Sequence, residues 1–486
     1  MRNFEAGYVT DSASSQFGEN RPRATDPAYQ AQPLRDDNRN ITRFQLVTVT
    51  QKKIVMSKKQ VFIIGLDDFN LKKLQALPEA EECEFHAALD ISEIRDVEEY
   101  DMEKLINLCF DRIDKHGQID AVASYYDFPG TVLVPVIAEK YNLPGPSLES
   151  VLKCEHKFWS RVEQNKVISE HIPYFKAFDP FDDEAYEKLD MIPPFWIKPT
   201  KSFRSFLAFR ISSESHFYEN TKTIQENIHF MLEPFHDLMK MYNMPEEVAD
   251  MDESCIAESM ISGHQCTLEG YAFNGNVVSY GVVDSLREEN RSSFSRYEYP
   301  SVLPQEIQFR MADVTRRAIQ QIGLDNAPFN VEFFYNQTAD EVYLLEINPR
   351  ISQAHTDIFE KVHGISHHSI MLNLALGRKP KTLYYNGEFS KAAHFMLRTF
   401  EGGVIKKVPT KREINILKKF IPGLEVKIPV KSGTHTSEMQ GQDSYSFELA
   451  NVFIGGRDQA ELVEKYNKVC DGLTFEIEYD ESVHVH

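Results

Sequence analysis

Two apolar segments in the second half of the chain carry oxygen-bearing side chains. Segment 330–335 contains Glu332, and segment 342–348 contains Glu346 and ends at Asn348. Both segments are rich in β-forming residues and flank a polar stretch, so we predict two paired strands joined by a turn. Carboxylate and amide oxygens are the hard ligands that Mg²⁺ prefers, including where it is shared with nucleotide phosphates. The hairpin is therefore predicted to hold Mg²⁺ through Glu332, Glu346 and Asn348.

The competing interpretation is a surface hairpin that carries two solvated acids. It is disfavoured because Glu332 and Glu346 interrupt otherwise apolar strands. An unpaired carboxylate in such a strand is costly to bury, so a cation or another partner is expected beside the two acids.

The overall charge argues against one class of partner. The chain has 53 Lys and Arg residues against 74 Asp and Glu residues, a formal net charge of −21. Proteins that bind the nucleic-acid backbone need a basic face, so we expect no nucleic-acid partner. The 486 residues, of which 42% are hydrophobic, suffice for roughly two to four domains of ordinary globular composition.

Targeting and thiol signals favour a cytoplasmic protein. The chain has no apolar run of about eighteen residues and no apolar signal core at its start, so we expect no membrane span. The cysteines form no CxxC pair, which predicts free thiols in a reducing compartment. They are Cys83, Cys109, Cys154, Cys255, Cys266 and Cys470. A homodimer is the commonest assembly of soluble enzymes, and the oligomeric state is otherwise left open.

Helix and strand patterns alternate in the first part of the chain. Residues 1–55 are polar without a sustained period and are predicted to be a disordered tail. The alternation that follows favours a small parallel α/β domain at 56–145. The predicted strands there are 61–65 and 119–125, and the predicted helices are 70–77, 102–116 and 132–141.

The rest of the chain mixes strands and helices, so the predicted fold class is α/β with α+β character. A polar, irregular connection is predicted at 285–301, where Arg287, Arg291 and Arg296 are candidates to bind a substrate carboxylate. A solvated loop is the competing interpretation of this stretch. The predicted helices are 148–164, 305–322, 364–376 and 459–470. The predicted strands include 195–199, 206–211, 258–261, 266–273, 277–283, 392–400, 425–430, 447–454 and 474–477.

The order of these parts resembles the ATP-grasp superfamily from about residue 61 to 480. The most specific part is Asn-Val-Glu-Phe-Phe at 330–334, followed by Leu-Glu-Ile-Asn-Pro-Arg at 345–350. The resemblance implies a pre-ATP-grasp α/β domain at 56–145, a two-lobed ATP-grasp domain at 146–390 with its lid at about 195–262, and a strand-rich C-terminal subdomain at 391–486.

The resemblance implies a site for ATP. Lys157 and Lys198 look like the two lysines that contact the nucleotide phosphates, a task suited to a compact charge on a flexible stem. The lid after Lys198 is commonly rich in glycine and serine. Here Ser205 matches a family serine, but the segment contains no glycine. Lys201 or Arg204 would then supply charge where the backbone cannot approach the phosphates as freely.

The same resemblance implies contacts to the nucleoside. Residues 258–261 look like the segment between the two lobes, where Glu258 would hold the adenine amino group and Ile261 would meet the adenine edge through its backbone. The family usually has an acidic residue two positions after the next glycine, and this chain has Gln265 there. Glu269 is therefore the candidate for the ribose contact. An ordinary strand glutamate is the competing interpretation of Glu258.

The metal hairpin and the arginine after it complete the implied site. Glu332, Glu346 and Asn348 resemble ligands of a Mg²⁺ ion that bridges the β- and γ-phosphates, with Mn²⁺ as an alternative. Arg350 would face the transferred group. A guanidinium binds a carboxylate or an acyl phosphate through two hydrogen bonds and stabilises the oxyanion formed by attack on it.

The C-terminal part resembles carboxylate–amine ligases that join amino acids, with Gly402-Gly403 and Gly455-Gly456 among the similar residues. Such a ligase phosphorylates a substrate carboxylate with ATP, and an amine then attacks the acyl phosphate, so that ADP and phosphate are released. The implied partners are a small-molecule carboxylate and a small-molecule amine, whose identities stay open. His355 or a water would accept the amine proton.

Two other functions are retained as alternatives. Residues 348–355 also resemble biotin carboxylases, which carry a catalytic glutamate just before the histidine. This chain has Ala354 there, so the carboxylase ranks second. The glycine-free lid also fits an ATP-binding relative that has lost turnover, against which stand the intact metal hairpin and Arg350.

Overall fold

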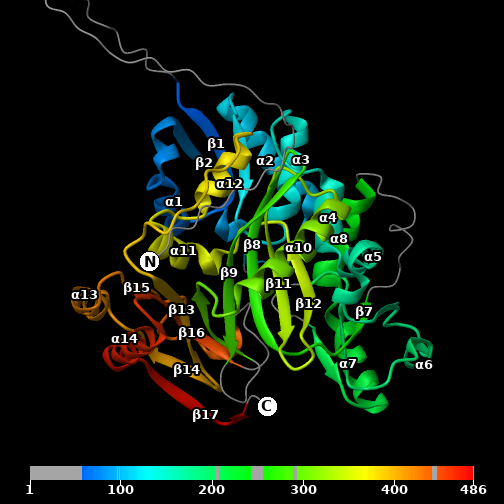
Figure 1. The fold of residues 1–486 in the computed structure, drawn as a ribbon. Coiled ribbons are helices and arrows are strands. Elements are labelled where there is room, and N and C mark those ends of the chain that lie inside the picture. The colour runs from blue at the N-terminus through cyan, green and yellow to red at the C-terminus, as the bar shows by residue number, and fades with distance from the viewer. Residues whose placement is uncertain are drawn as a thin grey trace, which may run out of the picture. The chain divides into compact units, whose positions relative to one another are not determined.

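The structure is a computed structural model that describes residues 57–95, 97, 99–202, 207–241, 255–287, 293–439 and 446–484. The predicted tail 1–55 lies outside this part of the chain. Figure 1 shows the described residues as helices packed on β-sheets. The sheets of this part of the chain have three, eight, two and four strands. The mixed α/β fold class is confirmed.

The first part of the described chain is a small parallel α/β unit, as predicted. Its sheet has the order β2-β1-β3, and β1 pairs in parallel with both neighbours. Ligands of open α/β sheets bind beyond the carboxyl ends of the strands, where the strand order reverses. The elements are β1 (Lys59–Leu66), α1 (Asp68–Gln75), β2 (Cys83–Asp90), α2 (Met102–His116), β3 (Ala121–Ser124) and α3 (Gly130–Lys140), with 3₁₀ turns at Pro78–Glu82 and Ile91–Glu93.

The bounds of α2 follow from its sequence. Asp101 caps the helix, because its side chain accepts a hydrogen bond from the backbone N–H of Lys104. Gly117 ends the helix with a φ of 85°, a conformation that glycine adopts without a steric cost. The face that packs on the sheet consists of apolar residues at helical spacing. Its buried members are Met102, Leu105, Ile106, Cys109 and Ile113.

The lid region contains a four-stranded antiparallel sheet of order β4-β7-β5-β6. Ile197 of β5 packs into an apolar core with Phe217 and Ile224. Successive side chains of a strand point to opposite faces, so Lys198 lies on the face away from this core. The elements are β4 (Phe175–Phe178), α6 (Ala185–Leu189), β5 (Phe195–Pro199), β6 (Phe209–Ile211), α7 (Glu214–Asn227), α8 (His229–Met241) and β7 (Cys255–Ser259).

The central sheet has eight strands in the order β12-β11-β8-β9-β10-β13-β16-β15, with every neighbouring pair antiparallel. It continues across the predicted boundary at residue 391, because β10 pairs with β13. The strands are β8 (His264–Phe273), β9 (Asn276–Arg287), β10 (Phe294–Tyr299), β11 (Ala327–Asn336), β12 (Glu341–Asn348), β13 (Lys391–Thr399), β15 (Glu425–Lys427) and β16 (Phe447–Gly456).

Helices flank the central sheet, and α10 packs against both α5 and strands of this sheet (Figure 1). A separate two-stranded sheet pairs β14 (Glu401–Lys407) with β17 (Glu476–His484). The remaining helices are α4 (Leu148–Glu155), α5 (Lys157–Ile168), α10 (Gln305–Ile322), α11 (Thr356–His363), α12 (His368–Ala375), α13 (Lys411–Phe420) and α14 (Gln459–Gly472). Single 3₁₀ turns lie at Ser169–His171, Gln353–His355 and Thr436–Glu438.

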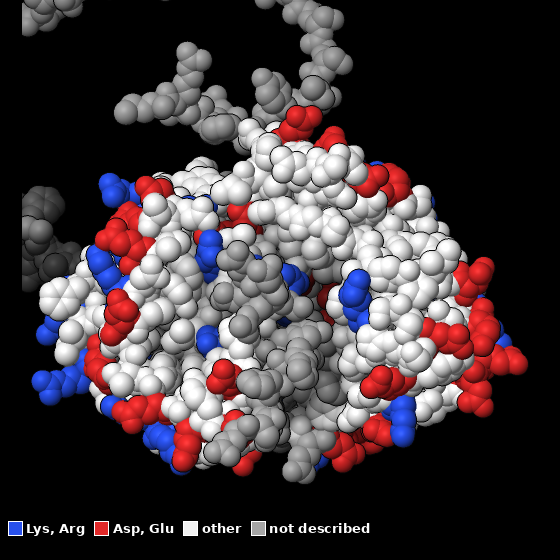
Figure 2. Space-filling model, turned by 90° about the horizontal axis from the view of Figure 1, so that it is seen from below, with Lys and Arg blue, Asp and Glu red and all other residues white. Residues whose placement is uncertain are grey.

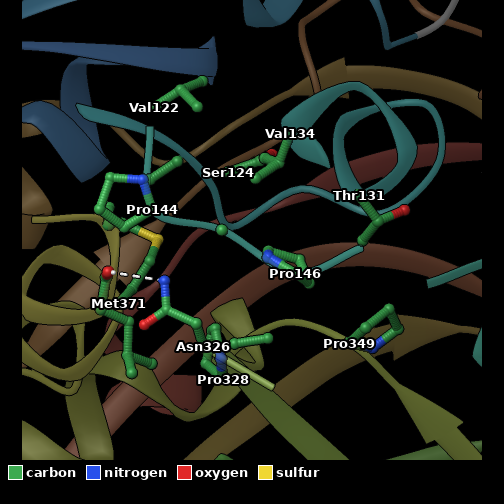
Figure 3. Close-up of a pocket in the computed structure, with 15 residues that line it drawn as sticks. Val122, Ser124, Thr131, Val134, Pro144, Pro146, Asn326, Pro328, Pro349 and Met371 are labelled. Carbon is green, nitrogen blue, oxygen red and sulfur yellow. Dashed lines mark hydrogen bonds between the residues drawn. The ribbon is translucent and has the colours of Figure 1, made fainter. Parts of the chain in front are cut away.

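The α/β unit packs against the end of the β11–β12 hairpin. A cavity of about 30 Å³ marks this contact. Figure 3 shows Val122 and Ser124 on one side of the cavity, Asn326 on the other, and Pro349 at its edge. A cavity of this size has room for about one water molecule. The packing fixes the end of β3 close to Pro349, the residue just before Arg350.

The predicted helix 148–164 is two helices. His156 has an extended backbone, with φ −86° and ψ 103°, which separates α4 from α5. Its ring nitrogen Nδ1 accepts a hydrogen bond from the backbone N–H of Trp159 at 3.1 Å, so His156 caps α5. Lys157 is therefore the first residue of a helix rather than a mid-helix residue.

The predicted irregular connection at 285–301 consists mainly of strands. β9 runs to Arg287, β10 starts at Phe294, and the two strands pair. The prediction of an irregular connection was wrong because the polar side chains hid the strand pattern. β10 forms because pairing with β9 and β13 satisfies its backbone hydrogen-bonding groups. Residues 288–292 lie outside the described part of the chain.

Two predicted boundaries also differ. β7 ends at Ser259, so Ile261 lies beyond the strand in which it was predicted. The helix predicted from residue 364 starts at His368, because Gly364 takes a φ of 77° and ends the preceding helix, α11.

The surface and the thiols agree with the composition. Figure 2 shows acidic and basic side chains interspersed over the described part of one face, with basic side chains also in the hollow at its centre. All six cysteines are free, and all but Cys470 are buried. Within the described ranges, no helix has the length and apolarity needed to span a membrane.

Candidate active site

The β11–β12 pairing brings the three predicted metal ligands together. Glu332 lies directly opposite Glu346 in the ladder, and Asn330 lies opposite Asn348. Opposite residues share a face and lie about 5 Å apart between Cβ atoms, and residues two apart on a strand also share a face. Asn348 donates a hydrogen bond from Nδ2 to Oδ1 of Asn330 at 3.1 Å, which orients its amide. The hairpin therefore presents two carboxylates and an amide on one face.

The charges of this hairpin suit a divalent cation. Burial and the neighbouring charge of Glu346 raise the pKa of Glu332 to about 7. Burial also acts to raise the pKa of Glu346, but Lys157 and Lys198 outweigh it and hold this pKa below its ordinary value. Among the described residues, no three His, Cys, Asp or Glu side chains form a metal cluster. Two carboxylates and one amide leave coordination positions for phosphate oxygens, so the residues fit Mg²⁺ shared with a nucleotide.

Lys157 joins this hairpin to the start of the lid segment. Its Nζ donates to Oε1 of Glu346 at 2.7 Å and to the backbone oxygen of Ser202 at 2.8 Å. Its backbone N–H donates to the carbonyl oxygen of Thr200 at 2.8 Å. A lysine at this position could reach phosphates that share a metal ion with Glu346.

Lys198 and Glu258 meet on the sheet of the lid. Lys198 Nζ lies 2.6 Å from Oε2 of Glu258, whose Oε1 accepts a hydrogen bond from Nε of Arg161 at 2.6 Å. Burial opposes ionisation, but the two cations lower the pKa of Glu258 to about 2. Arg161 also donates to the carbonyl oxygen of Leu345, next to Glu346. Sequence reasoning missed Arg161, although it follows Lys157 by one helical turn and therefore shares its face.

Arg350 is bound by a residue of the α/β unit. Its Nη2 donates to Oδ2 of Asp127 at 2.5 Å and lies 3.5 Å from Oδ1 of Asn348. Its Nε is buried and has no hydrogen-bond acceptor among the described residues. Close by, Gln353 donates from Nε2 to the carbonyl oxygen of Tyr125 at 3.2 Å. Asp127 was not among the predicted site residues, and its position just beyond the carboxyl end of β3 was the available signal.

His355 and Glu269 form a buried pair. Nδ1 of His355 lies 2.7 Å from Oε1 of Glu269. Burial and Arg350 lower the pKa of His355 to about 3, and burial raises the pKa of Glu269 to about 7 although His367 opposes it. The predicted ribose contact of Glu269 stays a prediction, and its neighbour in this structure is the imidazole.

The predicted substrate arginines differ in their surroundings. Arg287 donates to Oε1 of Gln265 at 2.8 Å, and Gln265 donates to Oε2 of Glu332 at 3.3 Å. Arg287 is therefore linked to the metal hairpin. Arg296 instead bonds Glu298 at 2.6 Å on its own strand, and the Glu298 side chain is almost fully buried.

Lys201, three residues after Lys198, is buried rather than free. Lys201 bonds Glu155 and lies over the ring of Phe128, with its Nζ 5.3 Å from the ring centroid. The charge that Lys201 was expected to offer a phosphate is therefore paired in this structure. The predicted residues Arg204, Ser205 and Arg291 lie outside the described part of the chain.

The comparisons with known proteins bear on this site directly. A family model of the ATP-grasp domain matches residues 191–357. These residues contain Lys198, Glu258 and the whole metal hairpin. Residues 191–357 are therefore similar to the ATP-grasp domain.

Solved structures share the ATP-grasp fold over most of the chain. An L-amino acid ligase from Bacillus licheniformis is 17% identical, covers 88% of this chain and 100% of its own, and has a TM-score of 0.67. A biotin carboxylase from Campylobacter jejuni is 16% identical, covers 86% of this chain and 92% of its own, and has a TM-score of 0.60. Identities this low establish the shared fold only.

A sequence relative is much longer than this chain. Urea amidolyase from Saccharomyces cerevisiae is 26% identical over 222 residues, which are 43% of this chain and 11% of that protein. The chain thus matches about a tenth of the length of that relative, and the match carries no activity by itself.

Two residues of the candidate site lie outside the matched range. Lys157 and Asp127 precede residue 191, yet they contact Glu346 and Arg350 within the match. The site is therefore assembled from three parts of the chain, namely the α/β unit, the start of α5 and the central sheet.

Proposed function

We propose that this chain is an ATP-dependent carboxylate–amine ligase that forms an amide bond through an acyl phosphate and releases ADP and phosphate. The observation that carries the proposal is the meeting of Glu332, Glu346, Lys157 and Arg350 at the end of one hairpin. This set combines hard metal ligands, a phosphate-binding cation and a carboxylate-binding guanidinium. Phosphoryl transfer depends mainly on such positioning and charge neutralisation.

In the first step, the substrate carboxylate attacks the γ-phosphorus of ATP. A bond forms between a carboxylate oxygen and phosphorus, the bond to the β–γ bridging oxygen breaks, and ADP leaves. Mg²⁺, or Mn²⁺ in its place, neutralises phosphate charge when held by Glu332, Glu346 and Asn348. Lys157 and Lys198 bind phosphate oxygens, and Arg350 orients the substrate carboxylate.

In the second step, the amine nitrogen attacks the acyl carbon and phosphate leaves. The amine loses one proton, and His355 or a water accepts it. Arg350 stabilises the oxyanion of the tetrahedral intermediate. No protein nucleophile takes part in this reaction.

The nucleoside end of the proposed ATP site is formed by the lid sheet and the segment after β7. We assign Glu258 to the adenine amino group and the backbone of Ile261 to the adenine edge. In this assignment Glu258 also fixes Lys198 and Arg161, so one carboxylate orders both the phosphate lysine and the helix that carries Lys157. Glu269 is the proposed ribose contact.

The substrates are proposed to be a small carboxylic acid and a small amine, and the enzyme to act in the cytoplasm as a homodimer. Similarity to an L-amino acid ligase supports amino acids as the first compounds to test. Arg287 is the substrate arginine with the best support, because it is linked through Gln265 to Glu332.

A biotin-carboxylase-like activity is the second candidate, favoured by the similar fold of the Campylobacter enzyme. Against it stands Ala354, because the carboxylase reaction as implied by the resemblance needs a carboxylate base there. An ATP-binding relative without turnover is the third.

The three candidates separate in one assay of ADP release. The purified chain is given Mg·ATP with amino acids singly and in pairs, with bicarbonate, or with neither. Release that requires an organic acid and an amine supports the ligase. Release that requires bicarbonate supports the carboxylase and contradicts the ligase. ATP binding without release in every arm supports the inactive relative.

A further inference from the structure

We propose that Asp127 selects an α-amino acid as the acid substrate, by binding its ammonium group while Arg350 binds its carboxylate. The inference rests on the proposed ligase reaction and adds to it a specificity residue from the α/β unit. Asp127 is the residue of this unit that bonds Arg350.

Asp127 is held in a fixed position at the carboxyl end of β3. Its Oδ1 accepts a hydrogen bond from the backbone N–H of Phe128 at 2.8 Å, and its carbonyl oxygen accepts one from the N–H of Gly130 at 2.7 Å. Its Oδ2 then faces Nη2 of Arg350 at 2.5 Å. The segment is also tied to the residues after β12 through Gln353 and Tyr125. A carboxylate fixed in this way is a preorganised acceptor for a cation.

Arg350 retains hydrogen-bonding capacity for a second carboxylate. One terminal nitrogen is bonded to Asp127, while Nε is buried without an acceptor among the described residues. A buried donor without an acceptor costs free energy, so a rotation of the guanidinium that brings Nε to a ligand oxygen is favoured. The Arg350 and Asp127 side chains are 17% and 23% exposed, which leaves both accessible to a small molecule.

The charge balance of the pair favours a zwitterion. Arg350 and Asp127 together are neutral, and an α-amino acid is neutral too. Placed side by side, Arg350, the substrate carboxylate, the substrate ammonium and Asp127 form a ring of four alternating charges. Each protein charge then contacts a substrate charge of opposite sign and keeps its protein partner nearby. A plain carboxylate would compete with Asp127 for the guanidinium and leave a poorly compensated buried charge, which is unfavourable. The nearby cation Lys201 does not take the place of the substrate ammonium beside Asp127, since Lys201 is bonded to Glu155.

The test uses hydroxylamine as a common amine, so that every activated acid is trapped as a hydroxamate. The full chain receives Mg·ATP, hydroxylamine and either an L-amino acid or the same acid without its amino group, over a panel of such pairs. ADP and hydroxamate are both measured, for the wild type, for Asp127→Asn and for Asp111→Asn. Asp111 is a matched control, because it is an exposed aspartate on α2 of the same unit. Thermal melting checks that each variant is folded.

The wild type is expected to prefer at least one amino acid over its matched acid by about tenfold or more in kcat/KM. Asp127→Asn is expected to reduce this preference by about tenfold, and Asp111→Asn to leave it unchanged. Equal losses for both members of a pair mean that Asp127 only positions Arg350, which overturns the inference. A wild type without any preference overturns it as well, even if the variant fails to fold. Absence of hydroxamate with every acid would overturn the ligase reaction itself, and the inference with it.

Discussion

Glu332 and Glu346 lie opposite each other on β11 and β12, and Lys157 bonds the second of them at 2.7 Å. The lysine comes from a helix 189 positions earlier in the chain. This contact joins the predicted metal hairpin to the predicted phosphate lysine without any intervening residue. It also explains why the pKa of Glu346 lies below its ordinary value although the side chain is only one-third exposed, since Lys157 and Lys198 compensate its charge.

The hairpin carboxylates are expected to be required for metal-dependent turnover. Glu346→Ala should lower ADP formation by about 100-fold at ordinary Mg²⁺ concentrations, because one of two carboxylate ligands is lost. The measurement is ADP formation as a function of Mg²⁺ concentration. Glu341→Ala is the control, because Glu341 is an exposed glutamate on the same strand. Normal ADP formation by Glu346→Ala at ordinary Mg²⁺ would rule out the metal assignment.

Lys157 is expected to bind ATP phosphates. Lys157→Met should weaken ATP binding by about tenfold or more, and methionine keeps helix propensity nearly unchanged. Titration calorimetry with Mg·ATP measures this directly. Lys166→Met on the same helix is the matched control, because the Lys166 side chain is 52% exposed. Equal ATP affinities of the two variants would contradict the assignment.

Arg161 is expected to stabilise the fold as well as the site. Arg161→Met removes one of the two cations that bond the buried carboxylate of Glu258. Breaking a buried ion pair typically costs about 3–5 kcal/mol, whereas an exposed pair contributes up to about 1 kcal/mol. Denaturant unfolding should therefore show a much larger loss for Arg161→Met than for Arg316→Met, whose pair with Asp313 is exposed. A small and similar loss of unfolding free energy for both variants would show that another group compensates the charge of Glu258.

Much of the metal hairpin could be predicted from the sequence, because strand alternation fixes which side chains share a face. The ladder that places Glu332 opposite Glu346 follows from two apolar strands and a short turn. The contacts that complete the site could not be predicted in this way. Asp127 and Arg350 are 223 positions apart, and Arg161 and Glu258 are 97 apart, so only the tertiary fold brings them together.

Local exceptions account for the other differences. A single extended residue, His156, divides a continuous helical pattern and moves Lys157 to the start of a helix. In β10 the polar composition concealed a strand that is stabilised by its neighbours on both sides. Strand formation depends on such neighbours more than on intrinsic propensity.

The pKa of Glu258 predicts how stability changes in acid. This pKa is about 2 in the folded protein against an ordinary value near 4.5. The folded state therefore binds fewer protons than the unfolded state between these values. The resulting stabilisation, up to about 3 kcal/mol, is complete above about pH 4.5 and is lost as the pH falls toward 2.

Glu258→Gln tests this dependence, because glutamine does not titrate. The difference in unfolding free energy between the wild type and Glu258→Gln should shrink between about pH 6 and about pH 3. Denaturant unfolding at several pH values measures it. A difference that stays constant over this range would mean that the pKa of Glu258 is not lowered in the folded protein.

The central claim is that a substrate carboxylate accepts the γ-phosphoryl group of ATP. The most direct measurement follows ¹⁸O from a labelled carboxylic acid during complete turnover with Mg·ATP and an amine, with mass spectrometry of the released phosphate. An acyl phosphate predicts that one carboxylate ¹⁸O atom appears in the phosphate for each ADP formed. Amide formation with unlabelled phosphate, or ADP release that requires bicarbonate and no organic acid, would contradict the proposed reaction.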